Sequence, residues 1–341
     1  MRGRRVSQAA YRPYHEDHRA AAAEPGRGRD ATKPTDIPAR GWLDIAWRLW
    51  TEITGDRILL IAAGATFYLL LALFPALAAF VSLYGFVADP KTIADHIAFL
   101  GGVLPTGGLD LIRNQLNSLA SQSTSALSWG FISGLVIALW SANSGIKSLF
   151  DGLNVAYEEE EKRSFIKLNL ISFGFTLGAM FVGIVMIVSV GVVPAVLAFL
   201  HLDRWTELLV SLLRWPILLV LVGFGISLLY RYGPSRARAK WRWITPGAIM
   251  ATVVWLLASW GFSFYLQHFA DYNATYGSLG AVIGFLVWTW ISVIILLAGA
   301  ELNSEMEHQT AHDSTTGEPR PMGERGAAMA DKLGISADAK S

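Results

Sequence analysis

Long apolar runs almost free of ionisable side chains divide this 341-residue sequence, and they constrain its fold more than any other feature. A helix needs about 20 mainly apolar residues to cross roughly 30 Å of hydrocarbon. Six stretches reach that length: 58–88, 127–146, 168–200, 207–230, 243–267 and 279–300. Between their ends, the one charged side chain is that of Arg214. The sequence therefore predicts an all-α membrane protein with six transmembrane helices.

The composition agrees with this prediction and excludes several classes of protein. Hydrophobic residues make up 53% of the chain and charged residues only 16%, whereas soluble domains are about 25% charged. The net charge is +1, so binding of nucleic acid through bulk charge is excluded. An ordinary soluble enzyme and a disordered protein are excluded as well.

The distribution of Lys and Arg predicts the orientation of the spans. Eleven of them precede the first span, four lie in the second connection and five in the fourth. The first connection holds two, the third one and the fifth none. Because cytoplasmic loops carry the excess of basic residues, both termini and the even connections are expected in the cytoplasm.

Four regions follow from this pattern. Residues 1–40 lack apolar periodicity and predict a disordered basic tail. Residues 41–57 carry apolar side chains at three-to-four spacing opposite charged ones, which predicts an amphipathic helix at the inner interface or a cap beneath the bundle. Residues 58–306 form the six-helix domain, and the polar residues 307–341 predict a second disordered tail.

Two further patterns concern how the helices pack. Apolar stripes within 93–119 predict two short amphipathic helices in the first outer loop, either a lid on a pathway or simple packing. Small residues also recur at four-residue spacing inside spans, which allows close approach of helices in lipid. The pairs are Gly130/Gly134, Gly174/Gly178 and Gly280/Gly284. We expect them to pack helices of one chain together in preference to forming a dimer.

Short segments rich in Gly, Pro and aromatic residues lie in the predicted spans or at their ends. They are Gly64-Ala65-Thr66-Phe67-Tyr68, Trp140-Ser141-Ala142-Asn143, Leu213-Arg214-Trp215-Pro216, Thr245-Pro246-Gly247-Ala248, Tyr276-Gly277-Ser278-Leu279 and Gly299-Ala300-Glu301-Leu302-Asn303. In this order, over about residues 42–305, the chain resembles the YihY/BrkB family. The resemblance implies a six-span protein of the bacterial inner membrane. Relatives carry the labels ribonuclease BN and virulence or serum-resistance factor, without a secure molecular activity.

The sequence offers no catalytic constellation. There is no Cys, which excludes thiolate catalysis and Cys-based metal sites, and the seven His show no metal-ligand spacing. The four adjacent carboxylates of Glu158–Glu161 are expected to fan out into solvent. We therefore predict no enzyme activity, no metal and no cofactor.

A basic stretch follows the fourth span. Its positive charge and interfacial Trp residues suit anionic lipid headgroups, and topology explains them without a nucleic-acid partner. The residues expected to face headgroups are Arg231, Arg236, Arg238, Lys240 and Arg242.

Four polar residues within or at the edge of the spans are the candidate substrate site: Arg214, Asn143, Lys147 and Glu301. A charge at depth in lipid costs about 3 kcal/mol unless it is paired or hydrated. Each residue also has a structural explanation. Arg214 could snorkel to the membrane surface, Asn143 could form a hydrogen bond between helices, and Glu301 could be solvated. The predicted function is binding or transport of an amphiphilic or anionic substrate such as a lipid. A non-transporting envelope scaffold or virulence factor is the alternative, with a membrane-bound ribonuclease third.

Overall fold

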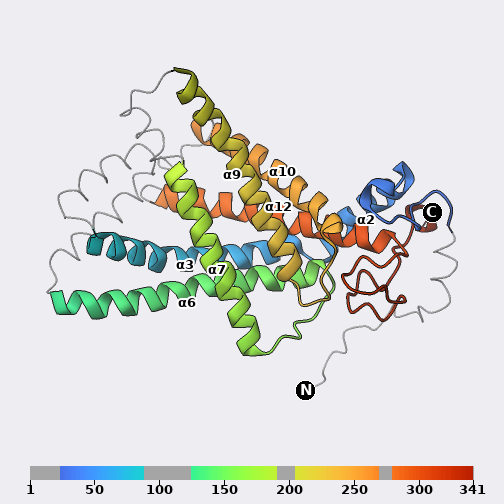
Figure 1. Cartoon of the computed structure of the whole chain (residues 1–341), viewed down its shortest axis with the longest axis horizontal. Helices are drawn as coiled ribbons and strands as arrows, with labels where there is room; N and C mark the ends of the chain where they lie inside the picture. Colours follow the sequence, from blue (N-terminus) through green and yellow to red (C-terminus); the bar gives the residue numbers. More distant parts are fainter. Residues whose placement is uncertain (1–23, 88–123, 190–203, 269–278, 341) are drawn as a thin grey trace.

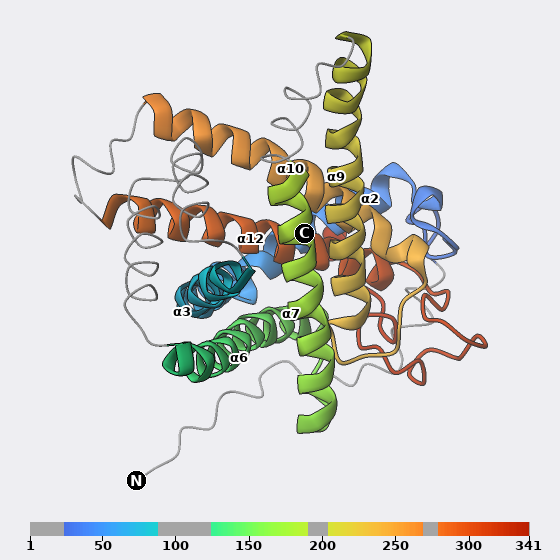
Figure 2. The ribbon, with the colours of Figure 1, turned by 60° about the vertical axis from the view of Figure 1, so that its left-hand side comes forward.

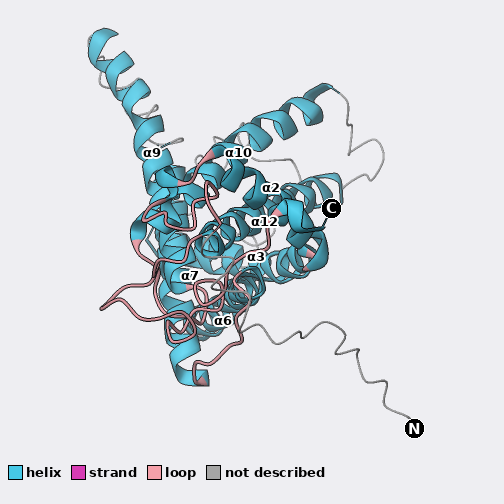
Figure 3. Cartoon of the chain, turned by 90° about the vertical axis from the view of Figure 1, so that its right-hand side faces the viewer, coloured by secondary structure: helices cyan, strands magenta, loops and turns pink. Residues whose placement is uncertain are grey.

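The computed structural model describes residues 24–87, 124–189, 204–268 and 279–340. Within these ranges the chain is helical, and an isolated bridge between Ala239 and Thr315 is the only strand-like pairing (Figures 1 and 3). The α-helices are α2 (Ala39–Gly55), α3 (Ile58–Val87), α6 (Thr124–Ala156), α7 (Phe165–Ile187), α9 (Arg204–Tyr232), α10 (Trp241–His268) and α12 (Gly280–Gln309). Two short 3-10 helices, η1 (Pro34–Asp36) and η4 (Ala337–Lys340), lie near the ends.

Each predicted span overlaps one long helix; α7 ends at Ile187, and residues 190–200 of the third predicted span lie outside the described residues. Among the described residues, four helical stretches are long and apolar enough to cross a membrane: Phe165–Gly183, Leu208–Tyr232, Trp241–Leu266 and Val282–Gln309. A fifth is added if α2 and the first half of α3, which meet at a 58° bend, count as one broken span. The full count of six and the side on which the termini lie stay predictions. The helices expected in the first outer loop lie outside the described residues.

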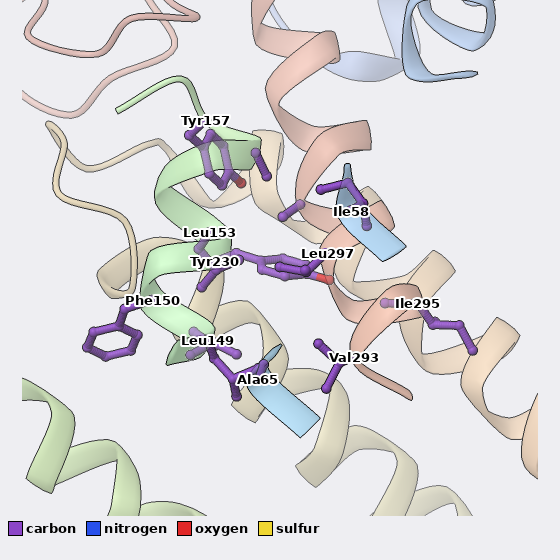
Figure 4. Close-up of a cluster of buried hydrophobic side chains, with 14 of the residues drawn as sticks. Ile58, Ala65, Leu149, Phe150, Leu153, Tyr157, Tyr230, Val293, Ile295 and Leu297 are labelled. Carbon is purple, nitrogen blue, oxygen red and sulfur yellow. The ribbon is translucent and has the colours of Figure 1, made fainter. Parts of the chain in front are cut away.

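The long helices enclose one apolar core. α3 lies beside α6, and α10 lies beside α12 (Figures 1 and 2). In the core, Tyr230 of α9 reaches between Leu153 of α6 and Leu297 of α12 (Figure 4). Its hydroxyl donates a hydrogen bond of 2.6 Å to the carbonyl oxygen of Leu296. A buried tyrosine hydroxyl with a partner costs little to bury, so Tyr230 ties α9 to α12.

α10 and α12 approach most closely at two glycines. A Cβ atom on Gly247 would lie 2.2 Å from the carbonyl oxygen of Gly299, so only glycine fits there. Pro246 has no N–H to donate within α10, and the next N–H, that of Gly247, donates to Oδ1 of Asn303 at 2.8 Å. The Thr-Pro-Gly-Ala and Gly-Ala-Glu-Leu-Asn segments singled out in the sequence thus meet in one helix crossing.

The segments 24–38 and 310–340 fold together with α2 over one end of the bundle, and we call this unit the cap (Figure 1). Arg27 donates to Asp44 at 2.8 Å and to Asp338 at 2.5 Å. The second contact joins residues 311 positions apart in the sequence.

The order of the cap differs from the disorder expected for both tails. Arg29 is 2% exposed and donates to the carbonyl oxygen of Gly334 at 2.7 Å, while the N–H of Gly334 donates to His308 at 2.8 Å. Polar hydrogen bonds and ion pairs join the two termini, and a separate small apolar cluster of Ala31, Ile37, Ile45, Trp243 and Met306 lies beneath them. Such pairing leaves no periodic apolar signal in either tail, which is why composition predicts disorder there.

The helix α2 turns its charged side toward the protein and its aromatic side away. Asp44 and Arg48 are buried, whereas Trp42 and Leu43 are exposed and Trp50 is 75% exposed. Arg48 forms an ion pair with Glu305 of α12. The expected amphipathic helix is therefore present. It caps the bundle with one face and leaves an aromatic face free, so the two alternatives for its role are compatible.

Candidate functional site

An apolar groove of about 690 Å³ lies between α7 and α9 and extends to α6. Most of its walls come from aliphatic and aromatic side chains of α7 and α9, such as Phe175, Val182, Leu221 and Phe224. Tyr232 is the most polar residue of the lining, and no charged side chain contributes. A smaller cavity of about 380 Å³ lies on the α10 side of α9. The larger groove has the size and apolar lining expected of a site for a hydrocarbon chain.

Glycines open this groove. Gly174 and Gly178 of α7 and Gly225 of α9 all line it, and a Cβ atom on any of them would meet nothing within 4 Å. The spacing of Gly174 and Gly178 predicts a close helix contact, and for this pair the prediction is wrong. Their missing side chains leave space between α7 and α9 instead of bringing the helices together.

Basic residues surround the end of the groove nearest the cap. The guanidinium of Arg238 lies 5.0 Å from the ring centre of Tyr232, which lines the groove, and that of Arg231 lies 4.6 Å from the ring centre of Trp241. Lys167 is exposed and lies one helical turn before Leu170, a groove residue, and thus on the same face of α7. The positive charge is placed where an anionic headgroup would emerge from the groove.

Of the four candidate polar residues, Asn143 and Lys147 come together. Both donate to Oδ1 of Asn169 on α7, at 3.1 Å and 3.2 Å. Asn143 is fully buried, and its own Oδ1 has no hydrogen-bond partner among the described residues. The neighbours Ile146 and Leu170 line the groove. The pair therefore forms a polar wall beside the groove, at the seam between α6 and α7.

Arg214 lies at the other end of the interface between α7 and α9, which we call the α7–α9 seam. Its guanidinium donates a long hydrogen bond of 3.5 Å to the carbonyl oxygen of Ser189, just beyond α7, and lies 5.3 Å from the ring centre of Trp215. Leu221, on the groove wall, is two helical turns further along α9. Arg214 is thus held between α7 and α9, and its guanidinium places a positive charge at the end of the seam away from the cap.

Glu301 belongs to a different cluster. It is 1% exposed, on α12, its Oε2 lies 3.4 Å from Oγ of Ser304, and Asp56 in the turn between α2 and α3 is near it. Burial raises the pKa of Asp56, and the negative charges of Glu158 and Glu305 add to the effect. The structure therefore places three of the four predicted residues along α6, α7 and α9, and the fourth at the base of the cap.

Three residues of these clusters were missed by reasoning from the sequence alone. Asn169 and Lys167 lie at the start of the predicted third span, where polar residues are common and carry no signal of their own. Asp56 precedes the first span and reads as a helix-end residue. Only its contact with Glu301, far away in sequence, distinguishes it.

The acidic run Glu158–Glu161 is engaged in structural contacts. Glu158 pairs with Lys332 and Glu159 with Lys162, both at 2.9 Å. Burial raises the pKa of Glu161, but hydrogen bonds from Arg163 and Asn154 outweigh that effect and lower the pKa to about 2. The expectation of a solvated carboxylate is confirmed for Glu160, which is exposed, whereas the other three carboxylates have separate partners and Glu159 is buried. They do not converge on a point where a metal ion could be held.

Arg236 is the member of the basic stretch that lies away from any headgroup. Its side chain is 2% exposed and donates to Glu307 at 2.6 Å. Its guanidinium also lies 4.7 Å from the ring centre of Tyr157. Arg238 and Arg242, by contrast, are exposed. In the described part of the chain, no group of three or more His, Asp or Glu side chains is placed to bind a metal ion.

Comparison with known proteins places the chain in a family. The model of a family described as "Virulence factor BrkB" matches residues 49–323. "Putative ribonuclease-like protein YfkH" of Bacillus subtilis is 32% identical over 256 residues, which cover 71% of this chain and 88% of the relative.

Two further relatives are named only as membrane proteins. "UPF0761 membrane protein Bxeno_A3061" of Paraburkholderia xenovorans is 28% identical over 74% of this chain, and the match spans 57% of that longer protein. "UPF0761 membrane protein PSHAa0171" of Pseudoalteromonas translucida is 26% identical over 76% of this chain and 84% of the relative. No solved structure matches the chain. The relatives and the apolar helices together show a multi-pass protein of the bacterial inner membrane.

Proposed function

The chain belongs to the BrkB family of bacterial membrane proteins, and we propose that it binds an anionic amphiphile such as a lipid and carries it along the α7–α9 seam. The groove supports this proposal most directly. It offers about 690 Å³ of apolar space between α7 and α9, and glycines keep this space open. Burying an acyl chain there contributes about 0.8 kcal/mol per methylene.

The basic side chains near the seam supply the headgroup contacts in this proposal. Lys167 and Arg238 flank the end of the groove near the cap, and Arg214 lies at the other end. Each cation near an anionic headgroup contributes about 1 kcal/mol. A phosphate group can therefore be attracted at either end, while its acyl chains stay in the groove or in the bilayer.

The topology in this proposal keeps six spans, with the cap in the cytoplasm. Basic residues gather at the cap end of the helices, among them Arg57, Arg163 and Arg242. The positive-inside rule places such an end in the cytoplasm. The exposed aromatic face of α2 then lies at the depth of the inner headgroups.

Native mass spectrometry of protein extracted with its surrounding lipid tests the proposal. We expect one phospholipid class to stay bound to the wild-type protein. Gly174→Leu and Gly178→Leu fill the groove and should reduce the bound fraction several-fold. Gly183→Leu is the matched control, because Gly183 is on the same helix with open space around it but does not line the groove. Equal lipid retention by all variants contradicts the groove as the binding site.

The same preparation addresses the two alternative functions. A stoichiometric protein partner without bound lipid favours an envelope scaffold. The name of the Bacillus subtilis relative suggests a ribonuclease, but here Glu158, Glu159 and Glu161 are each paired with a separate cation. We therefore propose no nuclease activity. RNA cleavage by pure protein that is lost in Glu159→Gln would contradict this.

A further inference from the structure

The helix α9 contacts both α7 and α10, and it separates the groove from the smaller cavity on its α10 side. Phe224 lines both spaces and is 54% exposed. Its neighbours along α9 line only one of them. Leu221 and Leu228 face the groove, whereas Val220 and Ser227 face the smaller cavity. The two spaces are therefore adjacent on the outward face of α9, and the ring of Phe224 divides them there.

The smaller cavity has the chemistry of a second acyl-chain site. Its volume of about 380 Å³ is a little over half that of the groove, and no charged side chain of the described residues lines it. Its polar side chains are hydroxyls that donate to carbonyl oxygens one turn earlier in their own helices. Ser227 donates to Gly223 at 2.8 Å, and Thr252 to Ala248 at 2.7 Å. Such hydroxyls leave no unpaired donor against a hydrocarbon chain.

Arg231 lies beyond Phe224 toward the cap, between the ends of the two spaces. It follows Phe224 by seven residues, which is two helical turns, and so lies on the same side of α9 about 10 Å further along. The ring of Trp241 lies 4.6 Å from the Arg231 guanidinium and stacks on the ring of Phe224 at 6.2 Å. Nη1 of Arg231 donates to the carbonyl oxygen of Ala239, whereas its Nε–H has no acceptor among the described residues. A guanidinium suits a phosphate group, so Arg231 is placed to hold a headgroup whose chains pass on either side of Phe224.

We propose that the amphiphile is a diacyl phospholipid that straddles α9, with one chain in the groove, the other in the smaller cavity and its phosphate at Arg231. This inference rests on the proposed function and adds the class of substrate to it. Arg242, next to Trp241, is exposed and adds positive charge at the same end of α10. A chain that enters either space leaves lipid rather than water, so its gain is contact with the walls. We therefore expect a several-fold preference for two chains over one.

Native mass spectrometry of the full-length protein tests the inference with added diacyl phosphatidylglycerol and its single-chain lyso form, which share a headgroup. We expect the wild-type protein to bind one diacyl molecule at this site, several-fold more tightly than the lyso form. Val253→Trp and Ile249→Trp fill the smaller cavity from positions that are 51% and 58% exposed, outside the packed core. Each should lower diacyl binding to the level of the lyso form. Val254→Trp, at the next position of α10 and outside the cavity lining, is the matched control and should leave diacyl binding unchanged.

Gly178→Leu, which fills the groove, distinguishes failure of this inference from failure of the proposed function. If it weakens binding of both lipids while Val253→Trp and Ile249→Trp weaken neither, the groove binds lipid alone and the two-chain site is overturned. If Gly178→Leu also has no effect, the proposed function falls with it. Two diacyl molecules bound per protein, one lost when the groove is filled and one when the smaller cavity is filled, would indicate separate lipids and overturn the straddling arrangement.

The headgroup position has its own test in the same measurement. Arg231→Gln should weaken binding of diacyl phosphatidylglycerol several-fold, because it removes the charge that faces the phosphate. Arg231→Lys keeps that charge and should restore most of the binding, which a merely structural role of the hydrogen bond to Ala239 would not predict. Unchanged binding by Arg231→Gln, or equal losses in the two variants, overturns the assignment of the phosphate to Arg231.

Discussion

Substituting Gly299 by alanine tests the closest helix crossing of the bundle. The added Cβ atom would lie 2.3 Å from the hydroxyl oxygen of Tyr230 and 2.8 Å from the carbonyl oxygen of Gly247. Favourable contacts between non-bonded atoms begin near 3.5 Å, so α10 or the tyrosine must move. Overpacking of this kind costs about 1–3 kcal/mol.

Two further contributions set the expected magnitude for Gly299→Ala. Moving Tyr230 weakens its hydrogen bond to Leu296, a loss of about 0.5–1.5 kcal/mol. The higher helix propensity of alanine returns about 1 kcal/mol. We therefore expect a net destabilisation of about 1–3 kcal/mol. The measurement is SDS-induced unfolding in mixed micelles, followed by tryptophan fluorescence.

Two control variants make the test decisive. Gly261 lies on α10 with nothing within 4 Å of an added Cβ, so Gly261→Ala should stabilise by about 0.5–1 kcal/mol. In the Tyr230→Phe background the nearest clashing atom is gone, and Gly299→Ala should cost less than in the wild type. Equal effects of Gly299→Ala and Gly261→Ala would refute the close crossing, and additivity with Tyr230→Phe would refute the role of the hydroxyl.

Three further outcomes are expected. Arg236→Leu should destabilise the protein by about 3–5 kcal/mol because it leaves Glu307 buried without its cation, and Arg236→Leu combined with Glu307→Leu should recover most of that loss in the same assay. The pKa of Glu161 is lowered from 4.5 to about 2, so the stabilisation that its carboxylate gives the fold is present above about pH 4.5 and is lost as the pH falls toward 2. Glu161→Gln should therefore lower the free energy of unfolding by about 1–2 kcal/mol near neutrality and leave it unchanged at pH 2. If the variant and the wild type show the same pH profile, the pairing is contradicted. A spin label attached to the sole cysteine of the Trp50→Cys variant should collide more often with lipid-soluble oxygen than with a water-soluble nickel complex, because the exposed face of α2 lies at the membrane interface. A higher accessibility to the nickel complex would place α2 in water.

The sequence predicts the helices well because their signal is local. A run such as 243–267 is apolar over a length that only a span requires, and α10 coincides with it to within two residues at each end. The cap has no such signal. It is held by contacts between distant residues, such as the ion pair of Arg27 with Asp338 and the apolar cluster of Ile37, Trp243 and Met306.

The polar residues of the site show the same division. Asn143 and Lys147 lie one turn apart on one helix, and their common environment could be predicted from that spacing. Glu301 was grouped with them because all are polar residues in or near apolar spans. Its partner Asp56 depends on the bend between α2 and α3, and no pattern within either helix encodes that contact.

Glycine placement explains why the groove and the closest helix crossing lie in different parts of the bundle. At Gly247 and Gly299 the missing Cβ atoms allow backbone contact, so α10 and α12 form a closely packed unit to which Tyr230 and the cap are attached. At Gly174 and Gly178 the same absence leaves open space, because among the described helices α7 packs mainly against α6 and α9. A hydrocarbon chain entering the groove gains contacts that α7 lacks, without displacing a packed side chain.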